Sequence, residues 1–211
     1  MFYGAGSFNQ AVGGLLSTTN ICVTTAAMFK NASKFNNGTS TDIDLWNTSN
    51  VTVMQSMFEN CSLFNRSIIS WDVSNVTHFQ SMFEDAVWFN QSFGGLNNGW
   101  DTTAGQRFDS MFESAKHFNQ ALYFDLSNAY SANSFLKNAS LYSQQMYVTF
   151  GNGSQSIVTQ GGLQKDPTNA QYLYNFISGT NYSTSLVNGL LTKLVQELRN
   201  LNTITHVGHL N

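Results

Sequence analysis

The sequence predicts a repeat solenoid of the leucine-rich-repeat type, and three observations predict it. One ten-residue block recurs as MFYGAGSFNQ, MFKNASKFNN, MFENCSLFNR, MFEDAVWFNQ and MFESAKHFNQ, and a degenerate sixth copy, FLKNASLYSQ, starts at Phe135. The methionines that open the five copies are 27, 29, 25 and 29 residues apart. A unit of that size cannot bury its own apolar face and stacks on its neighbours. Charged residues make up only 10% of the chain, which is low for an ordinary soluble domain.

The upstream half of each central repeat predicts a turn followed by a short strand. It reads WDVSNVTHFQSMF in the copy that starts at Trp71. Alternating β-branched and apolar residues at 51–54 and 76–79 predict the strands, which stacking would align into a parallel sheet on one face. The W-D-x-S-N segment predicts a turn in which Asp72 and Asp101 accept backbone N–H bonds from two residues further on.

The Met-Phe half predicts a short helix or helical turn on the opposite face, because Met82, Phe83, Ala86 and Phe89 have helical spacing. A uniformly small position marks close approach of neighbouring turns, at Ala5, Ala32, Cys61, Ala86, Ala115 and Ala139. Asparagines that both donate and accept are predicted to form a structural ladder at the Phe-Asn corner, at Asn9, Asn36, Asn65, Asn90 and Asn119. The regular spacing of large aromatic residues predicts a second core ladder of Trp46, Trp71 and Trp100.

The repeat pattern W-D-x-S-N-V-T-x-M-x-x-M-F-x-x-A-x-x-F-N-Q resembles a known family. It is similar to the leucine-rich-repeat-like surface proteins of the BspA type, which occur in mycoplasmas, other bacteria, protists and large viruses. The resemblance runs from residue 1 to about 144, with several positions recurring in register. It implies a right-handed solenoid with an adhesive or surface role, and it implies no catalytic residues.

The C-terminal part predicts a cap. Segments 146–150 and 156–159 predict final strands around a Gly-Asn-Gly turn. Asp166-Pro167 predicts the start of a helix that runs to about Ser178, and a leucine stripe predicts a second helix from near Ser183 to near Asn202. We therefore expect a solenoid of about five to six repeats at 1–150 and a two-helix cap at 151–211. The alternative is that the two helices form a subunit interface, and one pair of helices can do both.

The pattern of polar residues argues against an enzyme. The histidines are scattered, at His78, His117, His206 and His209, with no carboxylate or nucleophile at a useful offset. No phosphate-binding loop or zinc spacing occurs. A column of Glu59, Glu84 and Glu113 has the chemistry to hold calcium, but a solvated charged face is the favoured interpretation. We expect no catalytic residue, no metal and no cofactor.

Asparagine glycosylation and cysteine pairing remain open at this level. Eleven N-x-S/T sequons exceed the roughly five expected by chance. The best acceptors, expected to be exposed, are Asn31, Asn37, Asn60, Asn138, Asn152 and Asn181. Cys22 and Cys61 are interpreted as small core residues, and the alternative is a disulfide between adjacent turns.

The function that the sequence favours is structural. A net charge of −3 gives no reason to expect a nucleic acid partner, and no apolar run is long enough to span a bilayer. Solenoids need polar caps, and the first repeat has none, so we expect a partner chain or earlier repeats to cover it. The favoured function is an extracellular or cell-surface protein that self-associates head to tail into a fibre or surface layer. The alternatives are an adhesin for a host protein or glycan, and a structural component of a large virus particle.

Overall fold

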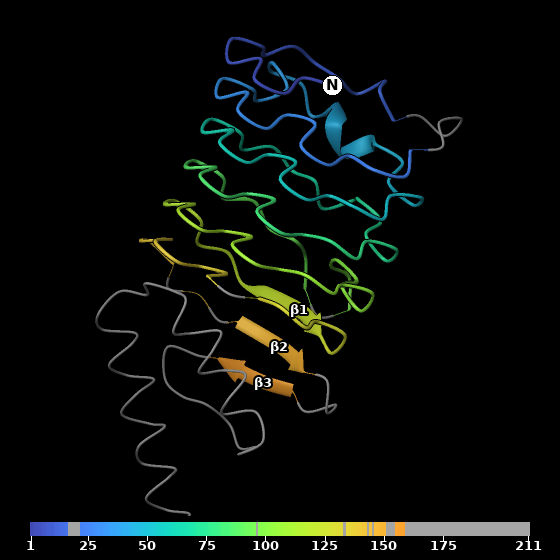
Figure 1. Cartoon of the computed structure of the whole chain (residues 1–211), viewed down its shortest axis with the longest axis vertical. Coiled ribbons are helices and arrows are strands. Elements are labelled where there is room, and N and C mark those ends of the chain that lie inside the picture. Colours follow the sequence, from blue (N-terminus) through green and yellow to red (C-terminus); the bar gives the residue numbers. More distant parts are fainter. Residues whose placement is uncertain are drawn as a thin grey trace, which may run out of the picture.

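The repeats wind into turns that lie one above the next, from the N-terminal turn at one end to a small sheet near the other (Figure 1). This computed structural model describes residues 1–16, 22–95, 97–132, 134–142, 144, 146–150 and 155–158. The elements are η1, a 3-10 helix at Asp42–Leu45, and the strands β1 (Leu122–Leu126), β2 (Met146–Phe150) and β3 (Gln155–Val158). Strands β1 and β2 are parallel, whereas β2 and β3 are antiparallel.

A column of single parallel β-bridges joins successive turns. The bridges pair Thr24 with Val53, Val53 with His78, His78 with Arg107, and Arg107 with Ser131. The segments at 51–54 and 76–79 supply part of this column, but each forms one bridge and not the strand that the sequence predicts. The extended stretch is short because a turn closes before it, with the Val51 amide bonded to the Thr48 carbonyl, and left-handed backbone at Ser56 ends it.

The Met-Phe half of the repeat is a series of β-turns, so of the two expected alternatives, a short helix or a helical turn, the helix is wrong. In the fourth copy, alternate amides donate to the carbonyl three residues earlier, namely those of Met82, Glu84 and Ala86. The amides between them donate to carbonyls of the next turn, namely those of Ser81, Phe83 and Asp85. An α-helix needs all of these amides for bonds within its own segment. Among the described residues, η1 is therefore the one helical element.

Left-handed backbone recurs at two positions of the repeat and helps to explain the composition of the second. The residue before the Met-Phe pair has φ between 51° and 56° at Ala27, Ser56, Ser81, Ser110 and Ser134. The second residue after the pair has φ between 56° and 71° at Gly4, Asn31, Asn60, Asp85, Ser114 and Asn138. Glycine, asparagine and aspartate adopt this conformation at the lowest cost. The polar variety at the second position is therefore a backbone requirement as well as a sign of exposure.

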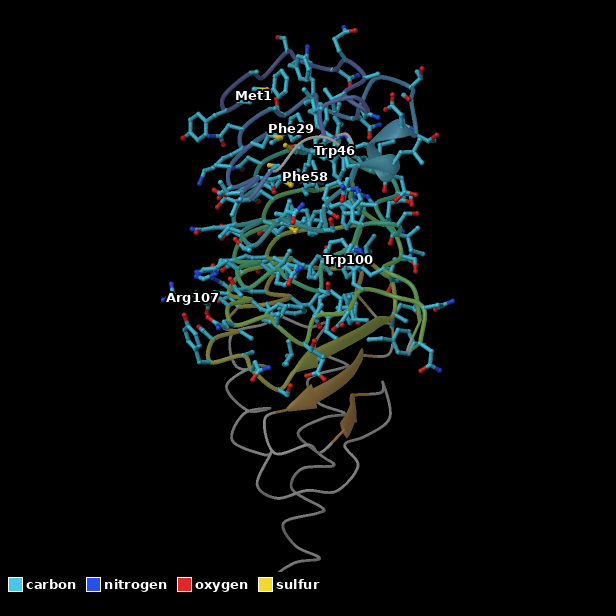
Figure 2. All side chains as sticks on the ribbon, turned by 90° about the vertical axis from the view of Figure 1, so that its right-hand side faces the viewer. Met1, Phe29, Trp46, Phe58, Trp100 and Arg107 are labelled. Atoms are coloured by element: carbon cyan, nitrogen blue, oxygen red, sulfur yellow. The ribbon has the colours of Figure 1, made fainter. Side chains whose placement is uncertain are left out.

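Stacked phenylalanine pairs fill the interior of the turns. Within one turn, the rings of Phe58 and Phe64 lie with their centroids 3.9 Å apart. The Phe58 ring also lies 5.7 Å from that of Phe29 in the preceding turn and 5.7 Å from that of Phe83 in the next. Figure 2 shows Phe29 and Phe58 inside the stack. Each ring therefore packs against rings within its turn and on both sides of it.

The tryptophan ladder forms a second buried column. Each indole Nε1 donates to a backbone carbonyl of the preceding turn over 2.8–3.1 Å, in Trp46, Trp71 and Trp100. The rings of Trp46 and Trp71 are 5.7 Å apart and nearly parallel, at 1°. Trp100 stacks instead on Phe124, at 6.5 Å. Because each N–H has an acceptor, these indoles are buried without an unsatisfied donor.

Asparagine side chains at the Phe-Asn corner bond each turn to the next. The Oδ1 atom of one asparagine accepts the backbone N–H of the next over 2.8–3.0 Å, along the series Asn9, Asn36, Asn65, Asn90 and Asn119. Gln91 and Gln120 add side-chain bonds to the same oxygens. At the opposite end of the repeat, Asp72 and Asp101 accept the amides two residues on, over 3.0 Å.

The sheet near the end of the described residues departs from the expected arrangement. Strand β1 occupies a segment interpreted as a turn, whereas β2 has the predicted bounds and β3 begins one residue early. Because β2 and β3 pair with each other, the sheet crosses position 150, where the sequence analysis divides the chain. The helices expected at 166–178 and 183–202 lie outside the described residues.

Both cysteines are free, so the alternative of a disulfide between turns is not realised. Cys61 is buried and its Sγ donates to the Phe29 carbonyl over 2.8 Å, while the half-buried Cys22 thiol donates to the Thr24 carbonyl. Both side chains act as small residues that fill space beside the aromatic core.

We expect Cys61 to be unreactive in the folded protein. Burial raises the pKa of its thiol to about 12, and the thiolate is the species that reacts. Titration with a chromogenic disulfide reagent at pH 8 should therefore detect one thiol, Cys22, in buffer and two in denaturant. Rapid reaction of both thiols without denaturant would contradict the burial of Cys61.

Candidate binding surface

Exposed side chains line one column of the stack, at the residue before the second phenylalanine of each block. From the third copy onward it holds Leu63, Trp88, His117 and Leu141, which we call the exposed column, and of these His117 is half-buried. Their four amides donate to carbonyls of the preceding turn over 3.0–3.2 Å, which places the residues one above another. Leu63, Trp88 and Leu141 remain 46%, 51% and 54% exposed. The stack therefore presents large apolar side chains to solvent in a row.

The centre of the exposed column is an ordered aromatic pair. The rings of Trp88 and His117 stack with centroids 3.9 Å apart and planes 15° apart. The His117 Nδ1 atom lies 3.0 Å from the Val87 carbonyl oxygen. Since a carbonyl only accepts, Nδ1 is the nitrogen that carries the proton. A side chain held in this way loses little conformational entropy when a partner binds.

This column was not expected from the sequence, in which His117 is one of several scattered histidines and Trp88 was not singled out. A usable signal was present, because this position changes from Ser7 and Lys34 to apolar or aromatic side chains in the later copies, while the aromatic residue after it is kept in every copy. Large apolar residues that occupy a variable position of a repeat are candidates for an exposed binding row.

A row of carboxylates lies three or four residues before the exposed column in the third, fourth and fifth copies. It consists of Glu59, Glu84, Asp85 and Glu113, which we call the acidic ladder. At its ends, Lys30 Nζ lies 2.6 Å from Glu59 Oε2 and Lys137 Nζ lies 2.8 Å from Glu113 Oε1. Over the described part of the chain, neither Glu84 nor Asp85 has an ion pair, and no group of three His, Cys, Asp or Glu residues is placed to hold a metal ion.

The two central carboxylates are held in an unfavourable environment for their charge. Burial raises the pKa of Glu84, a hydrogen bond from Ser81 lowers it, and the nearby carboxylates of Glu59 and Glu113 raise it again. Burial also raises the pKa of Asp85, the carboxylates of Glu113 and Glu59 add to that effect, and Lys116 opposes it. The centre of the ladder thus holds two carboxylates without an ion pair among the described residues, although the charges of Lys116 and Asp85, and of Lys137 and Glu84, act on each other.

Glu84→Gln is expected to raise the melting temperature at pH 7. Because the pKa of Glu84 is higher in the folded than in the unfolded chain, ionisation favours unfolding, and stability falls as the pH rises through that interval. The glutamine variant avoids this cost, so its advantage should be greatest at neutral pH. It should disappear in acid below the ordinary glutamate pKa of 4.5, where wild-type Glu84 is protonated in both states. Calorimetry of both proteins from pH 3 to 8 measures the difference, and a constant difference would contradict this explanation.

Three expected glycan acceptors lie in the left-handed positions. Asn138 is exposed, whereas Asn31 and Asn60 are half-buried. Glycosylation of these residues remains a proposal, best supported at Asn138. Asn152 and Asn181 lie outside the described residues.

Asn37 is fully buried, so its expected exposure is wrong. Its Nδ2 atom donates to the Ser40 carbonyl over 3.1 Å and to Asp42 Oδ1 over 2.7 Å. Its Oδ1 atom accepts the Val12 amide over 2.8 Å. A glycan on Nδ2 would replace one of the hydrogens that Nδ2 donates to Ser40 and Asp42, and it would have to fit at a fully buried side chain.

The bridge column carries a second group of polar side chains, which bond mainly to one another. The Arg107 guanidinium lies 5.2 Å from the centre of the Tyr130 ring and also bonds its hydroxyl. Next to it, His78 Nδ1 lies 2.7 Å from the Thr77 hydroxyl oxygen. Figure 2 shows Arg107 at the side of the stack. The structure thus gives His78 and His117 separate local partners, and His206 and His209 are outside the described residues.

One comparison with known proteins establishes the family. A family model described as "Mycoplasma protein of unknown function, DUF285" matches residues 1–41 and 38–149, which is more than half of the chain. The chain belongs to this family. The exposed column and the acidic ladder both lie within the DUF285 match. No curated protein and no solved structure matches the chain. In the part that the structure describes, no helix is long and apolar enough to cross a membrane.

Proposed function

We propose that this DUF285 chain is a non-enzymatic binding scaffold displayed at the cell surface. In this proposal it is a leucine-rich-repeat-like solenoid of the BspA type, and it holds a partner protein on the exposed column. The observation that carries the proposal is the row of Leu63, Trp88 and Leu141, three large apolar side chains that are each about half exposed, with His117 on the turn between the last two. Contiguous exposed apolar side chains mark interaction sites, and tryptophan is enriched among residues that dominate binding energy.

The rigidity of the stack supports this function. Backbone bonds, the asparagine ladder and the aromatic columns all link consecutive turns. The side chains of Leu63, Trp88 and Leu141 are therefore held at the spacing of the turns before a partner arrives. Preorganisation of this kind reduces the entropic cost of association.

The test compares adherence of beads coated with the whole chain to a monolayer of cultured epithelial cells. Trp88→Ala should reduce adherence at least tenfold while the melting temperature changes little, because the side chain is 51% exposed. Ser7→Ala, at the same repeat position in the first copy, is the matched control and should adhere like the wild type. Unchanged adherence of a folded Trp88→Ala variant would refute the proposal.

Head-to-tail self-association is a second candidate, favoured by the first turn. The rings of Phe2 and Phe8 are half-buried, whereas the equivalent rings of Phe58 and Phe64 are fully buried. Phe2 already stacks on Phe29 at 5.2 Å, and another repeat turn would cover its other side. Sedimentation velocity over a concentration series should then show growing species that Phe2→Ser suppresses. A monomer at all concentrations would exclude this candidate.

A further inference from the structure

The exposed column and the acidic ladder lie close together along the chain at the centre of the stack. Glu84 and Asp85 precede Trp88 by four and three residues, and Glu113 precedes His117 by four. Lys116, the chain neighbour of His117, lowers the pKa of Asp85 through its charge. A partner segment of a few residues that covers Trp88 can therefore reach the carboxylates of the same turn.

The distribution of lysines along the ladder leaves its centre uncompensated. The outer carboxylates each have an ion pair, Glu59 with Lys30 and Glu113 with Lys137. Glu84 lies between them without one. The charge of Lys116 lowers the pKa of Asp85, but the two side chains form no ion pair within the described residues. A cation supplied from outside would gain most at this point, because opposite charges nearby favour the ionised carboxylates.

We propose that the partner on the exposed column is a protein segment with one lysine or arginine flanked by apolar residues, whose cation binds at Glu84 and Asp85. This inference rests on the proposed function and names the chemistry of its partner. The apolar flanks would cover Leu63 and Trp88, and the basic group would complete the series of lysine–glutamate pairs. Charge complementarity of this kind selects partners and suppresses wrong ones.

Other partner classes fit this surface less well. Nucleic acids and anionic lipid surfaces carry the same charge as Glu84 and Asp85, so they would be repelled. Sugars stack on open faces of aromatic rings, and His117 covers one face of the Trp88 ring. An extended or helical protein segment can present apolar and basic side chains together, which is what the two adjoining rows require.

Trp88 provides a direct readout of occupancy. It is 51% exposed, whereas Trp46, Trp71 and Trp100 are 3%, 3% and 5% exposed. Since the chain has four tryptophans, quenching of its fluorescence by acrylamide reports mainly on Trp88. A ligand on the exposed column should reduce this quenching.

The experiment titrates the whole chain with three synthetic peptides. One has a lysine between two leucines, one has glutamine in place of the lysine, and one has the lysine between two serines. We expect the first peptide to protect Trp88 with at least tenfold higher affinity than the other two, and the difference should shrink as salt is added. Equal protection by the glutamine peptide, or no protection by any peptide, would overturn the inference.

A matched pair of double variants assigns the charge effect to this site. Glu84→Gln with Asp85→Asn should lose at least tenfold in affinity for the leucine–lysine peptide. Asp72→Asn with Asp101→Asn removes the same charge at exposed turns elsewhere and should bind like the wild type. Equal binding by both double variants would overturn the inference. The bead assay tests the proposed function separately. If the peptide experiments fail but Trp88→Ala still reduces bead adherence, the proposed function stands and only the chemistry of the partner is wrong. Unchanged adherence of Trp88→Ala would refute the proposed function itself.

Discussion

Phe58→Ala is expected to lower the free energy of unfolding by about 3–5 kcal/mol. The Phe58 ring is fully buried, and it packs at 3.9 Å on Phe64 within its turn and at 5.7 Å on Phe29 and Phe83 of the flanking turns. Its removal would leave a cavity at two interfaces between turns, and a stack is stabilised chiefly by such interfaces. Urea denaturation followed by circular dichroism measures the change as a lower midpoint.

Phe2→Ala is the matched control for this prediction. Phe2 occupies the equivalent place in the first copy, but its ring is half-buried and stacks on Phe8 and Phe29 only. Its truncation should cost clearly less than that of Phe58. Equal losses at the two positions would mean that contacts on both sides of a turn do not govern stability.

Asn60→Val is expected to destabilise the protein by about 1–3 kcal/mol. Asn60 has φ of 59°, a left-handed conformation in which a β-branched side chain clashes with its own backbone. The strain acts on a residue whose amide donates to the Glu84 carbonyl over 2.8 Å, so relaxing it would weaken a bond to the next turn. Thermal unfolding of the variant measures this loss.

Asn60→Gly separates backbone strain from loss of the asparagine side chain. Glycine adopts positive φ without a steric cost, and Gly4 occupies the equivalent position of the first copy with φ of 71°. The glycine variant should therefore be about as stable as the wild type. If glycine and valine lowered the melting temperature equally, the asparagine side chain and not the backbone would be the cause.

Much of the fold was predictable because the repeat aligns equivalent residues in register. The regular aromatic position predicted a ladder, and the structure buries Trp46, Trp71 and Trp100 in two stacked groups. The Phe-Asn corner predicted stacked amides, and the structure bonds Asn65 to Asn90 through the Oδ1 atom. Such positions repeat because the same contact recurs at every turn.

The local conformation of the Met-Phe half was not predictable from spacing. The apolar residues Met82, Phe83, Ala86 and Phe89 fit a helical period, yet the segment forms consecutive β-turns. The decisive factor is where the six amides from Ser81 to Ala86 find their acceptors. Half of them bond to the neighbouring turn, and that competition with helix formation leaves no trace in apolar periodicity.

The surface was the least predictable part, because exposure depends on neighbours. Asn37 shares the sequon of the exposed candidates, but the Val12 amide and the Asp42 carboxylate converge on it from elsewhere in the chain. Trp88 occupies a different position of the repeat from the other three tryptophans, and its side chain lies outside the aromatic core.

The sequence by itself determined the number and spacing of the repeats and the residues that meet at every interface between turns. These properties follow from periodicity, since identical side chains at a fixed interval stack on one another. The tertiary structure alone decided which variable positions face solvent and how the backbone bends between the fixed ones. Each turn shares its hydrogen bonds with the next, so the backbone adopts left-handed conformations at residues such as Ser81 and Asp85.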